Sequence, residues 1–207
     1  MLNIDFSIIG VTERRYCGDR VVESVRAAAK GGIRTIQLRE KGLSDIDFFK
    51  TAFTLTKLKE EMDINIFIND RYDIAEAASC DGVHLGNEDL PLYAVRKFYK
   101  GCIGKTVKSK DEAIKAQTEG ADYIAIGPFY NSNTKPQKIL LQKDILPEIK
   151  DAISIPIIVI GGITPLNASI LFEMGADGIA VSESLFKGNV VKNAKKLIDV
   201  TSKYGGN

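Results

Sequence analysis

Short apolar segments rich in isoleucine and valine alternate with longer segments of helical period along the chain. The apolar segments are continuous and do not alternate with polar positions. That pattern is typical of parallel strands that are covered on both faces. We expect strands at 7–12, 34–38, 65–68, 82–85, 102–107, 123–126, 157–163 and 178–181.

The segments between these strands carry helix signals. One places Val21, Val25 and Ala28 on a single stripe. Another begins directly after Ser44, a residue type that caps helix N-termini. Two others end at a glycine, which suits the left-handed conformation that stops a helix. We expect helices over 20–30, 45–61, 110–120 and 167–175.

A helix stop followed by a strand recurs through the chain. It reads Lys-Gly-Gly-Ile at 30–33, Ser-Cys-Asp-Gly at 79–82, Glu-Gly-Ala-Asp at 119–122 and Met-Gly-Ala-Asp at 174–177. Such recurrence indicates repeated βα units. About eight units in 207 residues predict an α/β fold of the (β/α)8 or TIM-barrel class, in a single domain over 1–207. An open doubly wound sheet is the alternative, but no Gly-x-Gly-x-x-Gly follows the first strand.

Composition narrows the classes of partner. The formal net charge of +1 gives no overall electrostatic reason to bind nucleic acid or an anionic membrane. No apolar run approaches the ~20 residues of a membrane span, and the N-terminus lacks the pattern of a secretory signal. Three widely spaced cysteines argue against a disulfide scaffold or a zinc site. We therefore expect a cytoplasmic protein without nucleic-acid or membrane partners.

The chain has one histidine, His84, which excludes mechanisms that need two histidines or a cluster of histidine ligands. It lies within an apolar strand. This position favours a structural, hydrogen-bonded core histidine over a catalytic one.

Charged residues gather at the carboxyl ends of the expected strands, where a barrel carries its reactive groups. Arg39 and Lys41 follow the second strand, and Lys135 follows the sixth. Asp70 and Asp89 follow the third and fourth. Taken singly, the cations could be solvated charges, Asp70 a helix cap and Asp89 the start of a turn. Together they have the composition of a magnesium–diphosphate site.

A second anion site is expected after the last two strands. Gly161, Gly162 and Ser182 stand where this fold binds a phosphate monoester through backbone N–H groups. The glycine pair could instead only allow close packing of strand and helix. Two anion sites at one rim suggest two phosphorylated substrates.

Six motifs occur in order over nearly the whole chain. They are Gln-Leu-Arg-Glu-Lys at 37–41, Ile-Asn-Asp-Arg at 68–71, Gly-Val-His-Leu-Gly at 82–86 with Asp89, Gly-Pro at 127–128 with Thr134-Lys135, Ile-Gly-Gly-Ile at 160–163 and Gly-Ala-Asp-Gly at 175–178. In these motifs the chain resembles the family of thiamine-phosphate synthases and thiazole tautomerases. The first three, with both aspartates, favour the synthase branch.

The resemblance implies a Mg²⁺-dependent transferase of thiamine biosynthesis. Such an enzyme joins a hydroxymethylpyrimidine diphosphate to a thiazole phosphate, giving thiamine phosphate and diphosphate. The reaction is dissociative, so it needs stabilisation of the leaving group more than a protein base. Arg39, Lys41 and Lys135 would be the catalytic cations.

The same resemblance assigns the remaining roles residue by residue. Asp70 and Asp89 would hold Mg²⁺, and Thr106, where serine is usual, would touch the diphosphate. The substrate-binding residues would be Gln37, Leu38, Arg39, Glu40, Lys41, Asn69, Thr106, Ser132, Asn133, Thr134, Lys135, Gly162, Val181 and Ser182.

Two other functions remain open on the sequence. One is a thiazole tautomerase or another phosphate-ligand barrel isomerase, which needs a proton shuttle. Lys108 stands where both branches often carry histidine, which counts against tautomerisation. The other is a non-catalytic phosphate-ligand barrel, for which the aspartate pair would have little use. The expected partners are the two small-molecule substrates, and homo-oligomerisation is left open.

Overall fold

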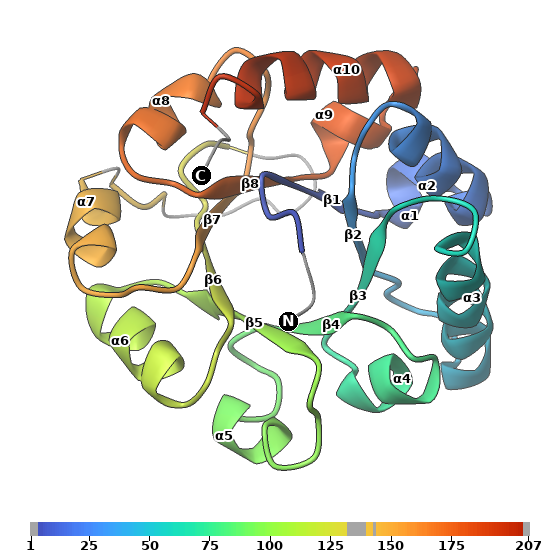
Figure 1. The fold of residues 1–207 in the computed structure, drawn as a ribbon, viewed down its shortest axis with the longest axis horizontal. Coiled ribbons are helices and arrows are strands. Elements are labelled where there is room, and N and C mark those ends of the chain that lie inside the picture. The colour runs from blue at the N-terminus through green and yellow to red at the C-terminus, as the bar shows by residue number, and fades with distance from the viewer. Residues whose placement is uncertain (1–3, 132–139, 143, 205–207) are drawn as a thin grey trace.

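The computed structural model describes residues 4–131, 140–142 and 144–204. Eight parallel strands close into a barrel in sequence order, and β8 pairs with β1 (Figure 1). The predicted (β/α)8 barrel is thereby confirmed. The strands are β1 Ile8–Val11, β2 Thr35–Leu38, β3 Asn65–Asn69, β4 Gly82–Leu85, β5 Cys102–Val107, β6 Tyr123–Ile126, β7 Ile157–Ile160 and β8 Gly178–Val181.

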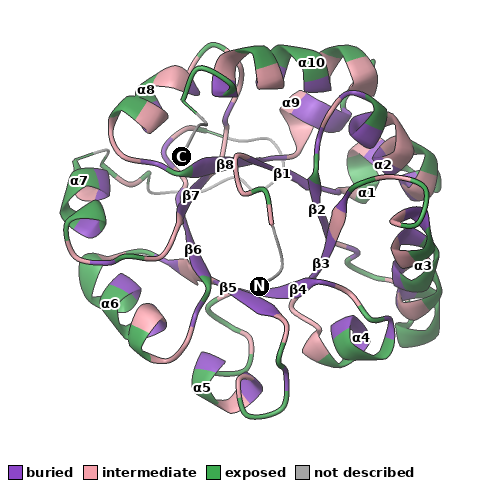
Figure 2. Cartoon of the chain, in the orientation of Figure 1, coloured by how far each residue is buried: buried purple, intermediate pink, exposed green. Residues whose placement is uncertain are grey.

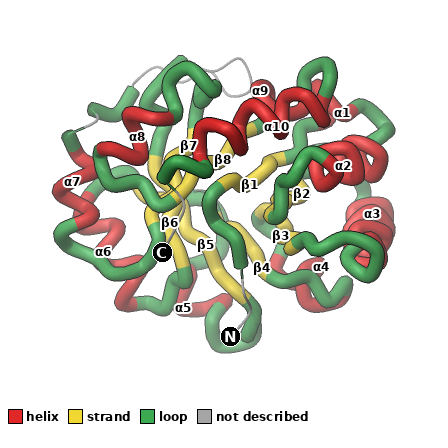
Figure 3. Tube along the Cα trace, turned by 45° about the horizontal axis from the view of Figure 1, so that its top comes forward, coloured by secondary structure: helices red, strands yellow, loops and turns green. Residues whose placement is uncertain are grey.

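Helices surround the strands on the outside, as Figure 3 shows in red around yellow. Among the described residues, no helix has the length and apolar character that crossing a membrane requires. The helices are α1 Arg14–Cys17, α2 Val21–Lys30, α3 Asp45–Leu58, α4 Tyr72–Ala77, α5 Leu92–Val95, α6 Lys110–Thr118, α7 Ile145–Lys150, α8 Ser169–Glu173, α9 Glu183–Phe186 and α10 Val190–Thr201.

Local signals in the sequence set several of these ends. The Ser44 hydroxyl accepts a hydrogen bond of 3.2 Å from the Asp47 N–H, as expected of an N-cap. Gly120 and Gly175 have φ values of 96° and 103°, the left-handed conformation expected where α6 and α8 stop. Both predictions are confirmed.

Several predicted elements are longer than the observed ones. The strand expected to reach residue 163 ends at Ile160, because Gly161 and Gly162 turn the backbone to φ values of 105° and 66°. The helix expected over 45–61 ends at Leu58, and the helix expected over 167–175 is shorter at both ends. Helix ends fray, so their last turns are the least determined by sequence.

The barrel has two cores separated by the sheet. The strands are buried on both faces (Figure 2), as the continuous apolar segments predicted. The outer core lies between sheet and helices. The inner core lies inside the barrel and consists of Ile9, Val11, Phe67, Cys102, Tyr123, Ala125, Ile158 and Ala180, with Ile4, Phe6 and Ile160 packed against it.

Side chains alternate between these cores along each strand. Phe67 and Cys102 belong to the inner core, so Asn69 and Thr106, two and four positions further on, face the same side. The inner core therefore gives way to polar side chains toward the carboxyl ends of the strands. This end of the barrel is where the candidate site lies.

Candidate active site

A layer of polar side chains lies at the carboxyl end of the inner core. The Gln37 amide Nε2 donates a hydrogen bond of 2.7 Å to Asn69 Oδ1. β2 and β3 are neighbours in register, with Gln37 opposite Phe67, and this brings the two amides together. The structure thus joins two of the residues that the sequence assigned to substrate binding.

His84 belongs to the same layer. Its Nδ1 lies 3.0 Å from the Tyr123 hydroxyl and its Nε2 lies 2.9 Å from Thr106 Oγ1. Burial, followed by the charge of Lys105, lowers the pKa of His84 to about 4, so the ring is neutral at pH 7. The predicted structural, hydrogen-bonded histidine is what the structure contains.

Asp70 and Asp89 come together at the ends of β3 and β4. Their carboxyl groups are within hydrogen-bonding reach of each other. Burial, and then the contact with Asp89, raises the pKa of Asp70 to about 6, while Lys41 and Arg39 act in the opposite direction. Two carboxylates in contact beside two cations favour a divalent cation between them.

The local backbone explains both positions. Asp70 has a φ of 68°, and its N–H donates to the His84 carbonyl at 2.8 Å across the strand ends. A non-glycine residue in this conformation is strained, a feature common at functional sites. Asp70 does not cap α4, whose N-cap is Arg71. Asp89 does close a turn, because its Oδ2 accepts from the Gly86 N–H at 2.5 Å.

Asp70 and Asp89 fit magnesium as two of its ligands. Among residues 4–131, 140–142 and 144–204, no group of three or more His, Cys, Asp and Glu side chains gathers to hold a metal ion. Mg²⁺ commonly uses one or two carboxylates and takes its remaining ligands from water and phosphate oxygens. The two carboxylates match this ligand type in number and chemistry.

Arg39 is held at the mouth of the barrel by β1 and the loop that follows it. Its guanidinium forms an ion pair with Glu13, and both side chains are 19% exposed. Its backbone N–H donates to the Thr12 hydroxyl at 2.9 Å. Glu13 and Thr12 were missed on the sequence, because a loop after the first strand carries no signal of its partner 26 residues away.

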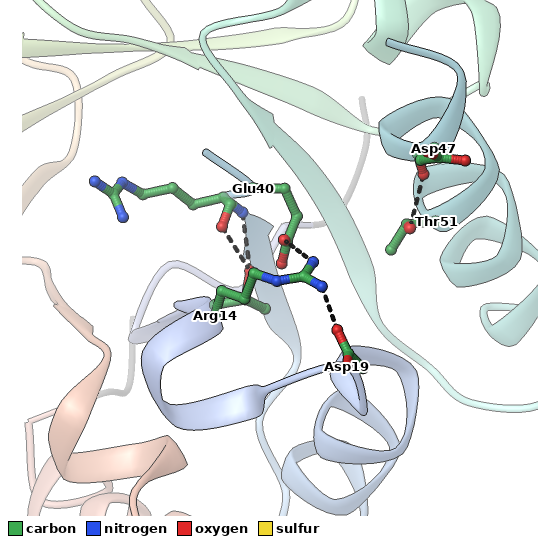
Figure 4. Close-up of polar contacts among 7 residues, drawn as sticks. Arg14, Asp19, Glu40, Asp47 and Thr51 are labelled. Atoms are coloured by element: carbon green, nitrogen blue, oxygen red, sulfur yellow. Dashed lines mark hydrogen bonds and ion pairs between the residues drawn. The ribbon is translucent and has the colours of Figure 1, made fainter. Parts of the chain in front are cut away.

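Leu38 and Glu40 point away from the site. The Leu38 side chain is fully buried in the outer core. The Glu40 side chain is also buried, and its carboxylate faces Arg14 at 3.5 Å, while Arg14 also pairs with Asp19 (Figure 4). Burial raises the pKa of Glu40, with Arg14 acting against the shift. Only the backbone of these two residues can reach a ligand at the mouth.

Lys105 is a second residue that the sequence did not single out. Its Nζ donates a hydrogen bond of 2.5 Å to the Gly86 carbonyl, in the turn that carries Asp89. Burial lowers the pKa of Lys105, with Asp89 acting against the shift. A lysine inside an apolar strand was the available signal, but its partner is visible only once β4 and β5 pair.

The second anion site lies after β7 and β8. Ile160 and Ala180 are partners in register, so Gly162 and Ser182 follow at adjacent points of the rim. The Ser182 hydroxyl oxygen is buried and has no hydrogen-bond partner among the described residues. Such a hydroxyl is ready to bind a ligand oxygen. The Val181 side chain is buried in the outer core and leaves only its backbone for a ligand.

Gly162 also permits close packing of two loops. A Cβ on it would lie 2.4 Å from the Asn131 carbonyl oxygen and 2.7 Å from Tyr130 Cβ. The packing at Gly162 is therefore between two loops, whereas the interpretation from the sequence was packing of strand against helix. Ser132, Asn133, Thr134 and Lys135 lie outside the described residues.

Comparisons with known proteins give matches over nearly the whole chain. Residues 8–185 match the family model described as thiamine monophosphate synthase. The thiamine-phosphate synthase of Clostridium acetobutylicum is 37% identical over 207 residues, covering 98% of each chain. That of Caldanaerobacter subterraneus subsp. tengcongensis is 35% identical over 202 residues, covering 96% of this chain and 94% of its own.

A solved structure agrees in both sequence and fold. Thiamine phosphate pyrophosphorylase from Pyrococcus furiosus is 32% identical, covers 100% of both chains and superposes with a TM-score of 0.91. A family match over most of the chain, with full-length relatives and the same barrel, establishes membership. The chain belongs to the thiamine monophosphate synthase family, a family of transferases in thiamine biosynthesis.

Proposed function

We propose that this site joins hydroxymethylpyrimidine diphosphate to thiazole phosphate, with Mg²⁺ held by Asp70 and Asp89. The observation that carries the proposal is the contact between these two carboxyl groups, beside Arg39 and Lys41. Family membership restricts the substrates to small molecules of thiamine synthesis. The acidic pair at the strand ends supports the branch that handles a diphosphate.

The pyrimidine substrate would bind over β2 and β3. Gln37 and Asn69 already contact each other there, and their remaining amide groups can hydrogen-bond an aminopyrimidine ring. Arg39 and Lys41 would bind the diphosphate, with Lys135 from the segment after β6. Magnesium, when bound, neutralises diphosphate oxygens and so supports departure of the leaving group.

The chemistry requires one bond to break and one to form. The bond between the pyrimidine methylene carbon and the diphosphate oxygen breaks, and the diphosphate keeps the electron pair. The thiazole nitrogen then donates its lone pair to the methylene carbon, so no proton has to be moved. The protein must stabilise charge and align the reactants. This agrees with a neutral His84 that is engaged on both ring nitrogens.

The thiazole phosphate would bind on the other side of the same rim. The Ser182 hydroxyl, which has no partner among residues 4–131, 140–142 and 144–204, and the backbone around Gly162 would hold its phosphate. Ser132, Asn133 and Thr134 would contact it from the segment after β6. The two phosphate groups then lie on opposite sides of the barrel mouth, with the reacting atoms between them.

One assay tests the proposal. Purified protein is mixed with both substrates and Mg²⁺, and thiamine phosphate and diphosphate are quantified. We expect equal amounts of the two products, and none when either substrate is left out or a chelator is added. Absence of thiamine phosphate together with isomerisation of a thiazole substrate alone would establish a tautomerase instead. Binding of both ligands without any conversion would establish a non-catalytic barrel.

A further inference from the structure

Tyr123, His84 and Thr106 form a chain of hydrogen bonds from the closed interior of the barrel to its mouth. The Tyr123 side chain is 1% exposed and belongs to the inner core. His84 is 7% exposed, and Thr106 is partly exposed at the carboxyl end of β5. The contacts are 3.0 Å between Tyr123 and His84 Nδ1, and 2.9 Å between His84 Nε2 and Thr106 Oγ1.

The buried Tyr123 hydroxyl determines which group donates in each of these two hydrogen bonds. In the described part of the protein, the only hydrogen bond of the Tyr123 hydroxyl is the one to His84 Nδ1. If His84 Nδ1 carried a proton and donated to Tyr123, the tyrosine O–H would be left without an acceptor in the core. Leaving a buried donor unsatisfied is costly. Tyr123 therefore donates and Nδ1 accepts.

This direction sets the histidine tautomer. A neutral imidazole has one N–H and one bare nitrogen, so acceptance at Nδ1 places the hydrogen on Nε2. The Nε2–H then donates to Thr106 Oγ1. In the opposite tautomer Nδ1–H would donate to Tyr123, and the Thr106 hydroxyl would donate to Nε2.

The tautomer in turn determines whether the Thr106 hydroxyl can donate a hydrogen bond to a ligand. A hydroxyl that accepts from His84 keeps its own hydrogen to donate. Among the residues that the structure describes, the Thr106 hydroxyl has no other hydrogen-bond partner. Its hydrogen is therefore available to an acceptor at the barrel mouth, which is the polarity that a diphosphate oxygen requires.

We propose that His84, fixed by Tyr123 as the Nε2–H tautomer, is a positioning residue that makes Thr106 a hydrogen-bond donor to an anionic ligand. The identity of that ligand as the diphosphate rests on the function proposed above. The hydrogen-bonded chain itself does not, because it rests on the contacts among these three residues alone.

A single histidine allows a direct test. In the protein labelled with ¹⁵N, long-range ¹H–¹⁵N correlation spectra contain one imidazole, so no assignment is needed. At pH 7 without substrate we expect a protonated Nε2 and an unprotonated Nδ1. A protonated Nδ1, alone or together with Nε2, would overturn the proposal.

Two tyrosine variants distinguish loss of the hydrogen-bond donor to His84 from loss of a buried hydroxyl in general. Tyr123→Phe removes the donor to Nδ1. Tyr99→Phe is the matched control, because the Tyr99 hydroxyl is also buried and donates to the Cys80 carbonyl at 3.3 Å, away from the strand ends that carry the site. We expect Nδ1 protonation to become populated in Tyr123→Phe only.

Inorganic diphosphate, titrated calorimetrically with Mg²⁺ present, gives the ligand readout. Thr106→Val should weaken its binding about tenfold, as for one lost hydrogen bond to a charged group, and Thr106→Ser should restore it. Tyr123→Phe should weaken binding in the same direction, and Tyr99→Phe should leave it unchanged. Unchanged diphosphate affinity in Tyr123→Phe would contradict the proposal. The function proposed above fails separately, if the unaltered protein forms no thiamine phosphate while the NMR tautomer is as expected.

Discussion

The carboxyl groups of Asp70 and Asp89 interact just beyond the ends of two adjacent strands, β3 and β4. Two acids are brought together there, and no cation of the described residues forms an ion pair with either of them. Arg39 and Lys41 are near enough to lower the pKa of Asp70 but not enough to offset burial and Asp89. The pair is therefore an unstable arrangement by itself, and a divalent cation would stabilise it.

Removing either carboxylate should raise the magnesium requirement. With Asp70→Ala or Asp89→Ala, we expect the Mg²⁺ concentration for half-maximal synthesis to rise sharply, because one of two protein ligands is lost. Magnesium titration of the assay is the measurement. Asp63→Ala is the control, since this aspartate is 99% exposed and pairs only with Arg34 at 3.9 Å. Full activity of both site variants at low Mg²⁺ would contradict the metal assignment.

Asp70→Asn should stabilise the metal-free protein at neutral pH. The pKa of Asp70 is raised to about 6 in the folded state, so folding favours its protonated form. The protonated Asp70 therefore contributes to the stability of the folded protein. This contribution is fully present below the unfolded pKa of about 4 and is lost as pH rises through about 6. Asparagine has no charge to bury and tolerates the positive φ of this position.

The measurement is urea unfolding with a chelator at several pH values. We expect Asp70→Asn to be more stable than the unaltered protein by about 1 kcal/mol at pH 8, because solvent screens this half-buried charge, with the difference shrinking toward pH 4. Asp73→Asn should not stabilise, because Arg71 holds the pKa of Asp73 below its usual range. A gain at pH 4 as large as that at pH 8 would show that the charge of Asp70 is not the cause.

Arg39→Ala should slow the chemical step as well as weaken pyrimidine diphosphate binding. Its guanidinium is largely buried at the barrel mouth. A positive charge that acts on the leaving group in such a site stabilises the transition state by on the order of 2–4 kcal/mol. Single-turnover rates at saturating substrate separate the two effects. Arg26→Ala, which removes a surface ion pair with Glu61, is the control. An unchanged single-turnover rate would make Arg39 an anchor only.

Gly162→Ala should weaken thiazole phosphate binding more than diphosphate binding, because Lys135 is the one residue of the segment after β6 that is assigned to the diphosphate. The added Cβ would meet the Asn131 carbonyl oxygen at 2.4 Å, so the segment after β6 must move. Gly120→Ala is the matched control for backbone strain, because its φ is also positive and its Cβ meets nothing closer than the Arg96 side chain at 3.4 Å. Both should lose about 1–2 kcal/mol of stability from the backbone alone. Separate titration of each substrate decides whether the two anion sites are correctly assigned.

Ser182→Ala should affect binding more than folding. Its hydroxyl oxygen is buried and has no hydrogen-bond partner in the described part of the chain, so removing it breaks no hydrogen bond there. We expect almost unchanged thermal stability, with thiazole phosphate binding weakened by about 1–2 kcal/mol. Ser24→Ala, which loses a hydrogen bond to the Arg20 carbonyl on the surface of α2, is the control. A large loss of stability without loss of binding would make Ser182 a structural residue.

The chain's own pattern determined the architecture and the location of the site. Continuous apolar strands and recurring glycine stops are local features, and a parallel barrel is the fold that buries them. Because all strands point the same way, residues after different strands reach one rim. Asp70 and Asp89 could therefore be paired on the sequence alone, and Ser44 and Gly120 could be placed at helix ends from their own chemistry.

The tertiary structure decided which polar groups are already engaged. The Thr106 hydroxyl meets His84, Arg39 meets Glu13 and Lys105 holds the Gly86 carbonyl, all across strands or loops far apart in the chain. The alternation of side chains along a strand shows only which face of the sheet each side chain lies on. The partner on that face depends on strand register and on side-chain reach, which are set when the barrel closes. For this reason the sequence predicted the residues of the rim, and only the closed barrel showed that the single histidine is hydrogen-bonded to one of them, Thr106.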